Sequence, residues 1–214
     1  MISPTIQLDA LEKDALTELV NIGVSRAAAS LRKMVGHQVL LSVPSVEVVS
    51  RTTAAGLLDS RESAELVAVR QDFEGAFSGR ALLIFPENTS LALVRAVTGG
   101  ELDAAEVAEM EEEALAETGN VVLYGCLANM ANMLQRPLEM SLPQVVRGDG
   151  RELFELSGPP SDEGVVLFLY INFAISGRDI RGYIAMLMDL PSLEALRGLI
   201  AEFIERVVGS DAAV

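Results

Sequence analysis

The sequence contains few of the residues that build metal or thiol centres, with one cysteine and one histidine among 214 residues. A single cysteine excludes an internal disulfide framework and is compatible with a reducing compartment. Because Cys126 falls within the apolar helical stretch 121–130, we interpret it as a small buried hydrophobic residue. His37 follows Gly36 where a helix should end, so we expect it at a cap or in a loop. A zinc site would have to depend on carboxylates, and we expect no metal site in this chain.

Basic residues are also scarce. The chain has 16 Lys and Arg against 31 Asp and Glu, a net charge of −15. This balance argues against a nucleic-acid partner, because phosphates need a basic patch. The longest apolar run, 165–175, is interrupted by Asn172 and is too short to cross a bilayer. The N-terminal residues lack the basic and apolar regions of a signal peptide, so we expect a cytoplasmic protein without membrane insertion.

Hydrophobic periodicity predicts the same order of elements twice. In the first half we expect a helix over 9–35, a strand over 38–49, a loop over 50–63, strands over 65–73 and 78–86, and a helix over 87–98. In the second half we expect a helix over 103–135, a strand over 137–146, a polar stretch over 147–164, strands over 164–175 and 179–188, and a helix over 191–208. Short hairpin connections favour antiparallel pairing of these strands.

The predicted fold class is α+β. We expect an internal duplication with pseudo-twofold symmetry, in which a largely antiparallel sheet is shared by the two halves and packed by long helices. Each half alone would bury too little apolar surface. We therefore expect a single domain over 1–214, made of repeats over about 9–100 and 103–208. Pro44 cannot donate to a sheet ladder, so its strand should lie at an edge or carry a bulge.

One polar motif recurs at a fixed offset of 99 residues, on the first predicted helix of each half. Two acidic residues four positions apart are followed three positions later by an asparagine, and a proline comes after 22 intervening residues. The two copies are Asp14, Glu18, Asn21 and Pro44, and Glu113, Glu117, Asn120 and Pro143. This spacing places the acids and the amide in a line on one helix face, offset from the apolar stripe. We therefore expect these side chains, with Ser25 and Tyr124 one turn further, to point to solvent.

A solvated acidic face is the simplest interpretation of one such copy, because any amphipathic helix has a polar side. The asparagine argues against it, since Asn is unfavourable inside a helix and prefers caps and turns. An asparagine at matching positions of both halves indicates a function instead. Its amide offers a donor and an acceptor in fixed geometry, which suits it to orienting a water molecule. The glutamate one turn earlier can bind a lysine or arginine of a partner.

The chain has no Walker glycine loop, no histidine pair and no obvious Mg²⁺ cluster that would hold a phosphate. A substrate of this surface would have to bring its own metal ion and cations. A phosphorylated protein meets that requirement better than a free small molecule does.

The repeated motif resembles the signature of the CheC/CheX/FliY family of chemotaxis phosphatases, and its two copies are similar to the CheC type. The stretches 18–23 and 42–44 share the similarity, which covers about residues 9–208. The resemblance implies a protein aspartyl-phosphate phosphatase that hydrolyses the phospho-aspartate of a CheY-type response regulator. It implies no cofactor of its own, because the response regulator supplies Mg²⁺. It also brings the receptor deamidase CheD as a candidate partner, which the sequence itself neither supports nor excludes.

The same resemblance implies a role for each motif residue. The asparagines would enter the active site of the regulator and orient the hydrolytic water, and the glutamates before them would pair with its lysine. The first acids would help to hold the partner or the motif, and the prolines would shape the strand behind each helix. These residues are, in that order, Asn21 and Asn120, Glu18 and Glu117, Asp14 and Glu113, and Pro44 and Pro143.

Two departures lie in the second copy. Glu113 stands where the family usually has Asp or Ser, and Val122 stands where the first copy has Gly23, so the second helix is expected to pack differently. Two alternative functions stay open. One is a non-catalytic CheC-like binding module for phospho-CheY or CheD. The other is a hydrolase of small molecules, which would need convergent acids in a concave pocket, whereas Asp14 and Glu18 are neighbours along one stripe.

Overall fold

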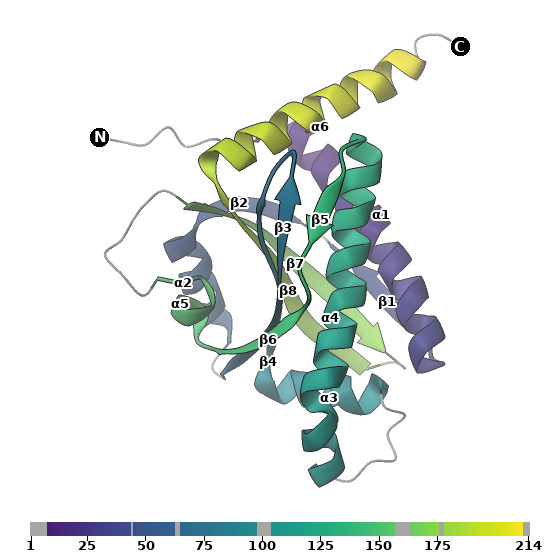
Figure 1. Cartoon of the computed structure of the whole chain (residues 1–214), viewed down its shortest axis with the longest axis vertical. Helices are drawn as coiled ribbons and strands as arrows, with labels where there is room; N and C mark the ends of the chain where they lie inside the picture. Colours follow the sequence, from purple (N-terminus) through teal and green to yellow (C-terminus); the bar gives the residue numbers. More distant parts are fainter. Residues whose placement is uncertain are drawn as a thin grey trace.

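The computed structural model describes residues 8–43, 45–62, 65–97, 104–156, 164–175 and 178–211. Each half has the order helix, two short strands, helix, two long strands, helix (Figure 1). The first half consists of α1 (Ala10–Val35), β1 (Val39–Ser42), β2 (Val46–Ser50), α2 (Arg51–Arg61), β3 (Leu66–Gly75), β4 (Gly79–Pro86) and α3 (Glu87–Val97). The second half consists of α4 (Ala104–Leu134), β5 (Leu138–Met140), β6 (Gln144–Gly148), α5 (Gly150–Leu153), β7 (Gly164–Ile175), β8 (Arg178–Asp189) and α6 (Leu190–Asp211).

In the described part of the chain, eight strands form one antiparallel sheet. Its order is β1, β7, β8, β4, β3 and β5, with β2 also paired to β7 and β6 also paired to β3. The short strands of the first half therefore pair with a long strand of the second half, and the reverse holds for β5 and β6. The two halves exchange their short strands, so the sheet needs both of them.

The strand register follows the duplication. Val39 of β1 pairs with Ile175 of β7. The residue 99 positions after Val39 is Leu138, and the residue 100 positions before Ile175 is Gly75. Leu138 of β5 and Gly75 of β3 also pair with each other. At the centre of the sheet β4 pairs with β8, so the approximate twofold axis passes between these two strands. The predicted duplication, pseudo-twofold symmetry and shared antiparallel sheet are confirmed.

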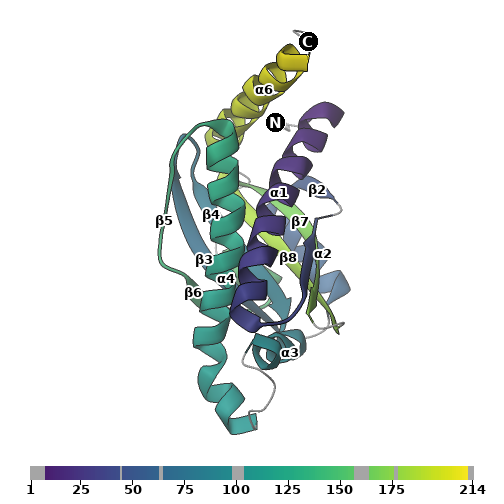
Figure 2. The ribbon, with the colours of Figure 1, turned by 90° about the vertical axis from the view of Figure 1, so that its right-hand side faces the viewer.

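Helices cover both faces of the sheet (Figures 1 and 2). α1 and α4 run side by side across one face, with α3 and α6 near their ends, and bury the larger hydrophobic core. α2 and α5 cover the other face, over a smaller core that contains Leu58, Phe154 and Phe168. Within the described ranges, none of the helices is long and apolar enough to cross a lipid bilayer.

The prediction of a loop over 50–63 is wrong, because this segment contains the helix α2. Ser50 begins the helix by accepting a hydrogen bond from the Thr53 N–H at 3.1 Å. Its buried side is narrow and consists of Ala54, Ala55 and Leu58. Most of its other residues are polar, so the apolar periodicity was too weak to indicate the helix.

The predicted strands 38–49 and 137–146 are each divided into two. The first becomes β1 and β2 at an edge of the sheet, as expected for a strand that contains proline, although Pro44 itself lies outside the described residues. The second becomes β5 and β6 at the opposite edge, with Pro143 between them. The polar stretch 147–164 contains the short helix α5, which the periodicity did not predict either.

Candidate functional site

The two motif helices approach each other closely through small residues. A Cβ at Gly23 of α1 would lie 2.8 Å from the Cα of Cys126 in α4, and a Cβ at Gly125 would lie 3.0 Å from the Cβ of Ala27. Cys126 is fully buried at this contact, and burial raises the pKa of its thiol to about 12. The interpretation of Cys126 as a small buried residue is therefore confirmed. The contact places both motifs on the same side of the sheet.

The four acidic residues of the two motifs are exposed, as the motif spacing predicts. They are Asp14 and Glu18 on α1, and Glu113 and Glu117 on α4. None of them forms an ion pair with another residue that the structure describes. Within the same ranges, no three of His, Cys, Asp and Glu are grouped so that they could hold a metal ion. The carboxylates are therefore free to bind cationic groups of a partner.

Asn21 is held against the backbone that follows β1. Its Nδ2 donates to the carbonyl oxygen of Val43 at 3.0 Å, and the Val43 N–H donates to its Oδ1 at 2.8 Å. The side chain is half-buried, whereas the helical spacing predicts that it points to solvent. The difference arises because the backbone of Val43 offers a donor and an acceptor that one carboxamide satisfies together. Since Val43 precedes Pro44, this pair of bonds links the asparagine and the proline segment of the first copy.

Asn120 is exposed and is held in another way. Its Oδ1 accepts a hydrogen bond from Nε2 of Gln71 at 3.0 Å. The same Nε2 donates to the carbonyl oxygen of Ser141 at 3.0 Å. The Asn120 amide nitrogen has no hydrogen-bond partner among the described residues. Sequence reasoning missed Gln71, because a single amide inside a strand gives no periodic signal.

The loop between β5 and β6 is bound to β3. The Ser141 N–H donates to the carbonyl oxygen of Asp72, and the Asp72 N–H donates to Oγ of Ser141, both at 2.9 Å. Leu142 is equivalent to Val43, yet Leu142 is 85% exposed and Val43 is 2% exposed. The loops beside the two asparagines therefore differ, although the surrounding helices and strands are related by the duplication.

Three of the predicted site residues, Glu18, Asn21 and Asn120, line open grooves. A groove of about 390 Å³ along α1 is lined by Glu18 and Asn21. Another, of about 330 Å³ between α1 and α4, is lined by Asn120 and Tyr124, and its described lining does not include Glu117. The structure thus brings the glutamate and the asparagine of the first motif to one groove. The two motifs form a surface that a macromolecule can contact, and their roles stay predictions.

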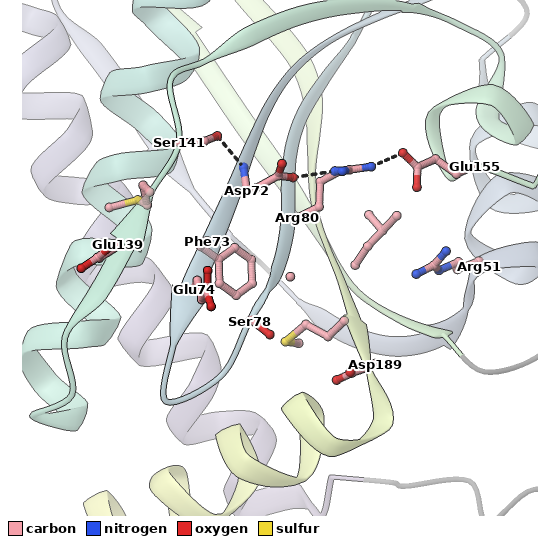
Figure 3. Close-up of a pocket in the computed structure, with 14 residues that line it drawn as sticks. Arg51, Asp72, Phe73, Glu74, Ser78, Arg80, Glu139, Ser141, Glu155 and Asp189 are labelled. Carbon is pink, nitrogen blue, oxygen red and sulfur yellow. Dashed lines mark hydrogen bonds and ion pairs between the residues drawn. The ribbon is translucent and has the colours of Figure 1, made fainter.

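A further pocket, of about 660 Å³, lies at the ends of β3, β4 and β8 (Figure 3). Arg80 lines this pocket and forms ion pairs with Asp72, at 2.7 Å, and with Glu155. The hydrogen bond to Asp72 raises the pKa of Arg80. The described lining contains none of the predicted site residues. Arg80 and Glu155 are 75 positions apart, so their ion pair gives no local sequence motif. Ser141 lines this pocket and also contacts Gln71 beside Asn120.

The crystal structure of FliY from Thermotoga maritima has the same fold, with a TM-score of 0.72 and 18% sequence identity over 92% of this chain and 100% of that one. The family model described as "Chemotaxis phosphatase CheX" matches residues 67–165.

Two curated relatives cover most of the chain. CheC1 of Halobacterium salinarum is 21% identical over 194 residues, which are 90% of this chain and 96% of that protein. The CheY-P phosphatase CheC of Bacillus subtilis is 23% identical over 195 residues, 86% of this chain and 91% of that protein. The resemblance to the CheC/CheX/FliY family, predicted from the repeated motif, is confirmed by these matches.

Proposed function

We propose that this chain hydrolyses the phospho-aspartate of a CheY-type response regulator, with Asn21 and Asn120 orienting the attacking water. One observation carries the proposal. Two carboxamides occupy equivalent positions on adjacent helices, and each is held by hydrogen bonds to a neighbouring element. Each also follows by three residues an exposed glutamate that has no ion-pair partner among the described residues. The name of the Bacillus subtilis relative, CheY-P phosphatase, supports the same substrate.

Hydrolysis of an aspartyl phosphate needs a water molecule in line with the bond from phosphorus to the carboxylate oxygen. The water attacks phosphorus, that P–O bond breaks, and the products are the free carboxylate and inorganic phosphate. A carboxamide can accept a hydrogen bond from the water through its oxygen and donate to a phosphoryl oxygen through its nitrogen. An amide that is already fixed loses little rotamer entropy at this step, so it orients the water at low cost.

The motif residues are acids and amides, which cannot neutralise a phosphoryl group. Mg²⁺ and the cations around the phosphate would therefore come from the response regulator. Glu18 and Glu117 are exposed and unpaired within the described ranges, which suits them to a lysine of the partner. Asp14 and Glu113, one turn earlier, would add to the attraction for the same cationic region.

A non-catalytic binding module is the second candidate, and the state of Asn21 favours it. Val43 occupies one donor and one acceptor of the Asn21 carboxamide, which leaves one N–H and one lone pair for a substrate. If neither amide reached the phosphoryl group, the chain would bind phospho-CheY, or CheD, without hydrolysis.

The lifetime of a phosphorylated CheY-type receiver domain with Mg²⁺ separates the two functions. A catalyst shortens this lifetime at substoichiometric amounts, whereas a binding module leaves it unchanged or lengthens it. Asn21→Ala and Asn120→Ala should each remove part of the acceleration, and the double variant should lose about 100-fold or more, because no amide then orients the water. Asn88→Ala, at an exposed asparagine on α3, is the matched control.

Two outcomes would contradict the proposal. Parental turnover in the double variant would show that the amides do not orient the water. Turnover of acetyl phosphate without any receiver domain would indicate a hydrolase of small molecules. Circular dichroism melts of each variant would separate lost chemistry from lost folding.

A further inference from the structure

We infer that Gln71 is a positioning residue of the second site, which holds the Asn120 carboxamide with its oxygen inward and its NH₂ group outward. The inference rests on the proposed function and names a residue outside the motif. Gln71 lies on β3 beneath α4 and is 1% exposed. It touches Asn120 through its side-chain nitrogen and is screened from solvent, so it would act through the asparagine.

The hydrogen bonds of Gln71 fix the geometry. Its Nε2 donates to Oδ1 of Asn120 and to the carbonyl oxygen of Ser141, each at 3.0 Å. An amide nitrogen carries two hydrogens in one plane, so both are used. The Gln71 side chain therefore joins α4 to the loop between β5 and β6, and the oxygen of Asn120 is directed toward the sheet.

Stability of the fold does not explain Gln71. Its Oε1 is buried without a hydrogen-bond partner among the described residues, and an unsatisfied buried acceptor costs about 1–3 kcal/mol. The shift of 100 residues that relates β3 to β7 places Ile171 at the equivalent position, where it is buried in the core on the same side of the sheet. An apolar side chain is thus compatible with this place in the fold, which indicates that the glutamine serves the site.

The consequence for Asn120 is an NH₂ group free to donate to a ligand. With its oxygen bound to Gln71, the exposed amide nitrogen has no partner in the described part of the chain. A phosphoryl oxygen can accept from this NH₂ group, and the attacking water can accept from it through one lone pair while its other lone pair attacks phosphorus. Without Gln71, the carboxamide could rotate about χ2, and the donor would be correctly placed for only part of the time.

The test measures Gln71→Leu in two backgrounds. In Asn21→Ala only the second site acts, and in Asn120→Ala only the first site acts. In the Asn21→Ala background we expect kcat for dephosphorylation of a CheY-type receiver domain to fall about tenfold, with little change in KM. The reason is that a misplaced Asn120 amide slows the chemical step. We expect no change in the second background. Ile171→Leu, at the equivalent buried position, is the matched control and should alter neither.

Thermal unfolding distinguishes positioning from a structural role. Gln71→Leu removes an unsatisfied acceptor, and the two oxygens that lose its hydrogen bonds belong to exposed residues and can bind water instead. Its Tm should therefore be equal to or higher than that of the parent while its turnover falls. The inference would be overturned if Gln71→Leu lowered kcat equally in both backgrounds. It would also be overturned if Gln71→Leu and Gln71→Met both lowered the Tm and the loss of kcat followed that drop. An unchanged kcat of Gln71→Leu in the Asn21→Ala background would overturn it as well. The same holds if Asn21→Ala alone has no turnover, because the second site would then be inactive. Parental turnover in Asn21→Ala/Asn120→Ala would instead refute the proposed function itself.

Discussion

Asn21 and Asn120 occupy equivalent positions on α1 and α4, yet different partners hold their carboxamides. The backbone of Val43 binds both ends of the Asn21 amide. The Gln71 side chain binds only the oxygen of Asn120. The helices, the sheet and its register follow the duplication, whereas the loops after β1 and β5 do not. The comparison indicates that the two sites share a framework but present their amides differently to a partner.

The contact between the motif helices is the strongest constraint on this framework. Gly23 of α1 faces backbone atoms of α4. A Cβ at this position would lie 2.8 Å from Cα of Cys126 and 3.1 Å from the carbonyl oxygen of Gly125. The equivalent position in α4 is Val122, which is fully buried. The sequence predicts that this departure alters the packing of the second helix, and the structure shows that the close approach on α1 depends on a glycine.

Gly23→Val should have the largest effect on stability. Backbone atoms cannot rotate away from the added side chain, so the helices must separate, and we expect a loss of about 3 kcal/mol. Urea denaturation measures it. Gly198→Val is the matched control, because a Cβ at Gly198 meets nothing within 4 Å, and its effect should stay within about 0.5 kcal/mol. Equal midpoints for Gly23→Val and the parent would show that α1 and α4 are not closely packed.

Replacing each asparagine by aspartate should have the second largest effect on stability, and the effect should differ between the two sites. In Asn21→Asp the introduced carboxylate can still accept from the Val43 N–H, but it faces the Val43 carbonyl oxygen without a hydrogen to donate. We expect a loss of about 2 kcal/mol. In Asn120→Asp the oxygen that accepts from Gln71 is kept, so the loss should stay below about 0.5 kcal/mol.

The loss of stability in Asn21→Asp should depend on pH. The protonated form of the introduced carboxyl can donate to Val43, so its pKa is higher in the folded than in the unfolded protein. The deficit should therefore shrink as pH falls through that raised pKa and grow as pH rises through it. A pH series of urea midpoints, with Asn120→Asp as the reference, checks this. A deficit that does not change with pH would contradict the hydrogen bonds assigned to Asn21.

Much of the fold could be predicted from the sequence, because long periodic segments have a strong signal. The helix 9–35 and the strand 164–175 agree with α1 and β7 within one residue at each end. The helix α2 could not be predicted in this way, since its buried face is three small or medium residues. Its signal was the Ser50 cap, which is weak by itself.

The site could be predicted only where its residues repeat. Asn21 and Asn120 were found because the same spacing occurs twice, whereas the hydrogen bonds between Asn21 and Val43 were not predicted, since the helical spacing placed this side chain in solvent. Gln71 was not, since its contact with Asn120 joins a strand of the first half to a helix of the second half. A contact between segments so far apart in the chain has no local pattern in either of them.

The smallest expected difference lies in the two loops. Val43→Ala removes two buried methyl groups and should cost about 1–2 kcal/mol. Leu142→Ala removes more apolar atoms, yet its side chain is 85% exposed, so the cost should stay within about 0.5 kcal/mol. Thermal unfolding of both variants measures the contrast. Equal losses would mean that the loop after β5 folds onto the protein as the one after β1 does, and the asymmetry between the two sites would then have to arise from Gln71 alone.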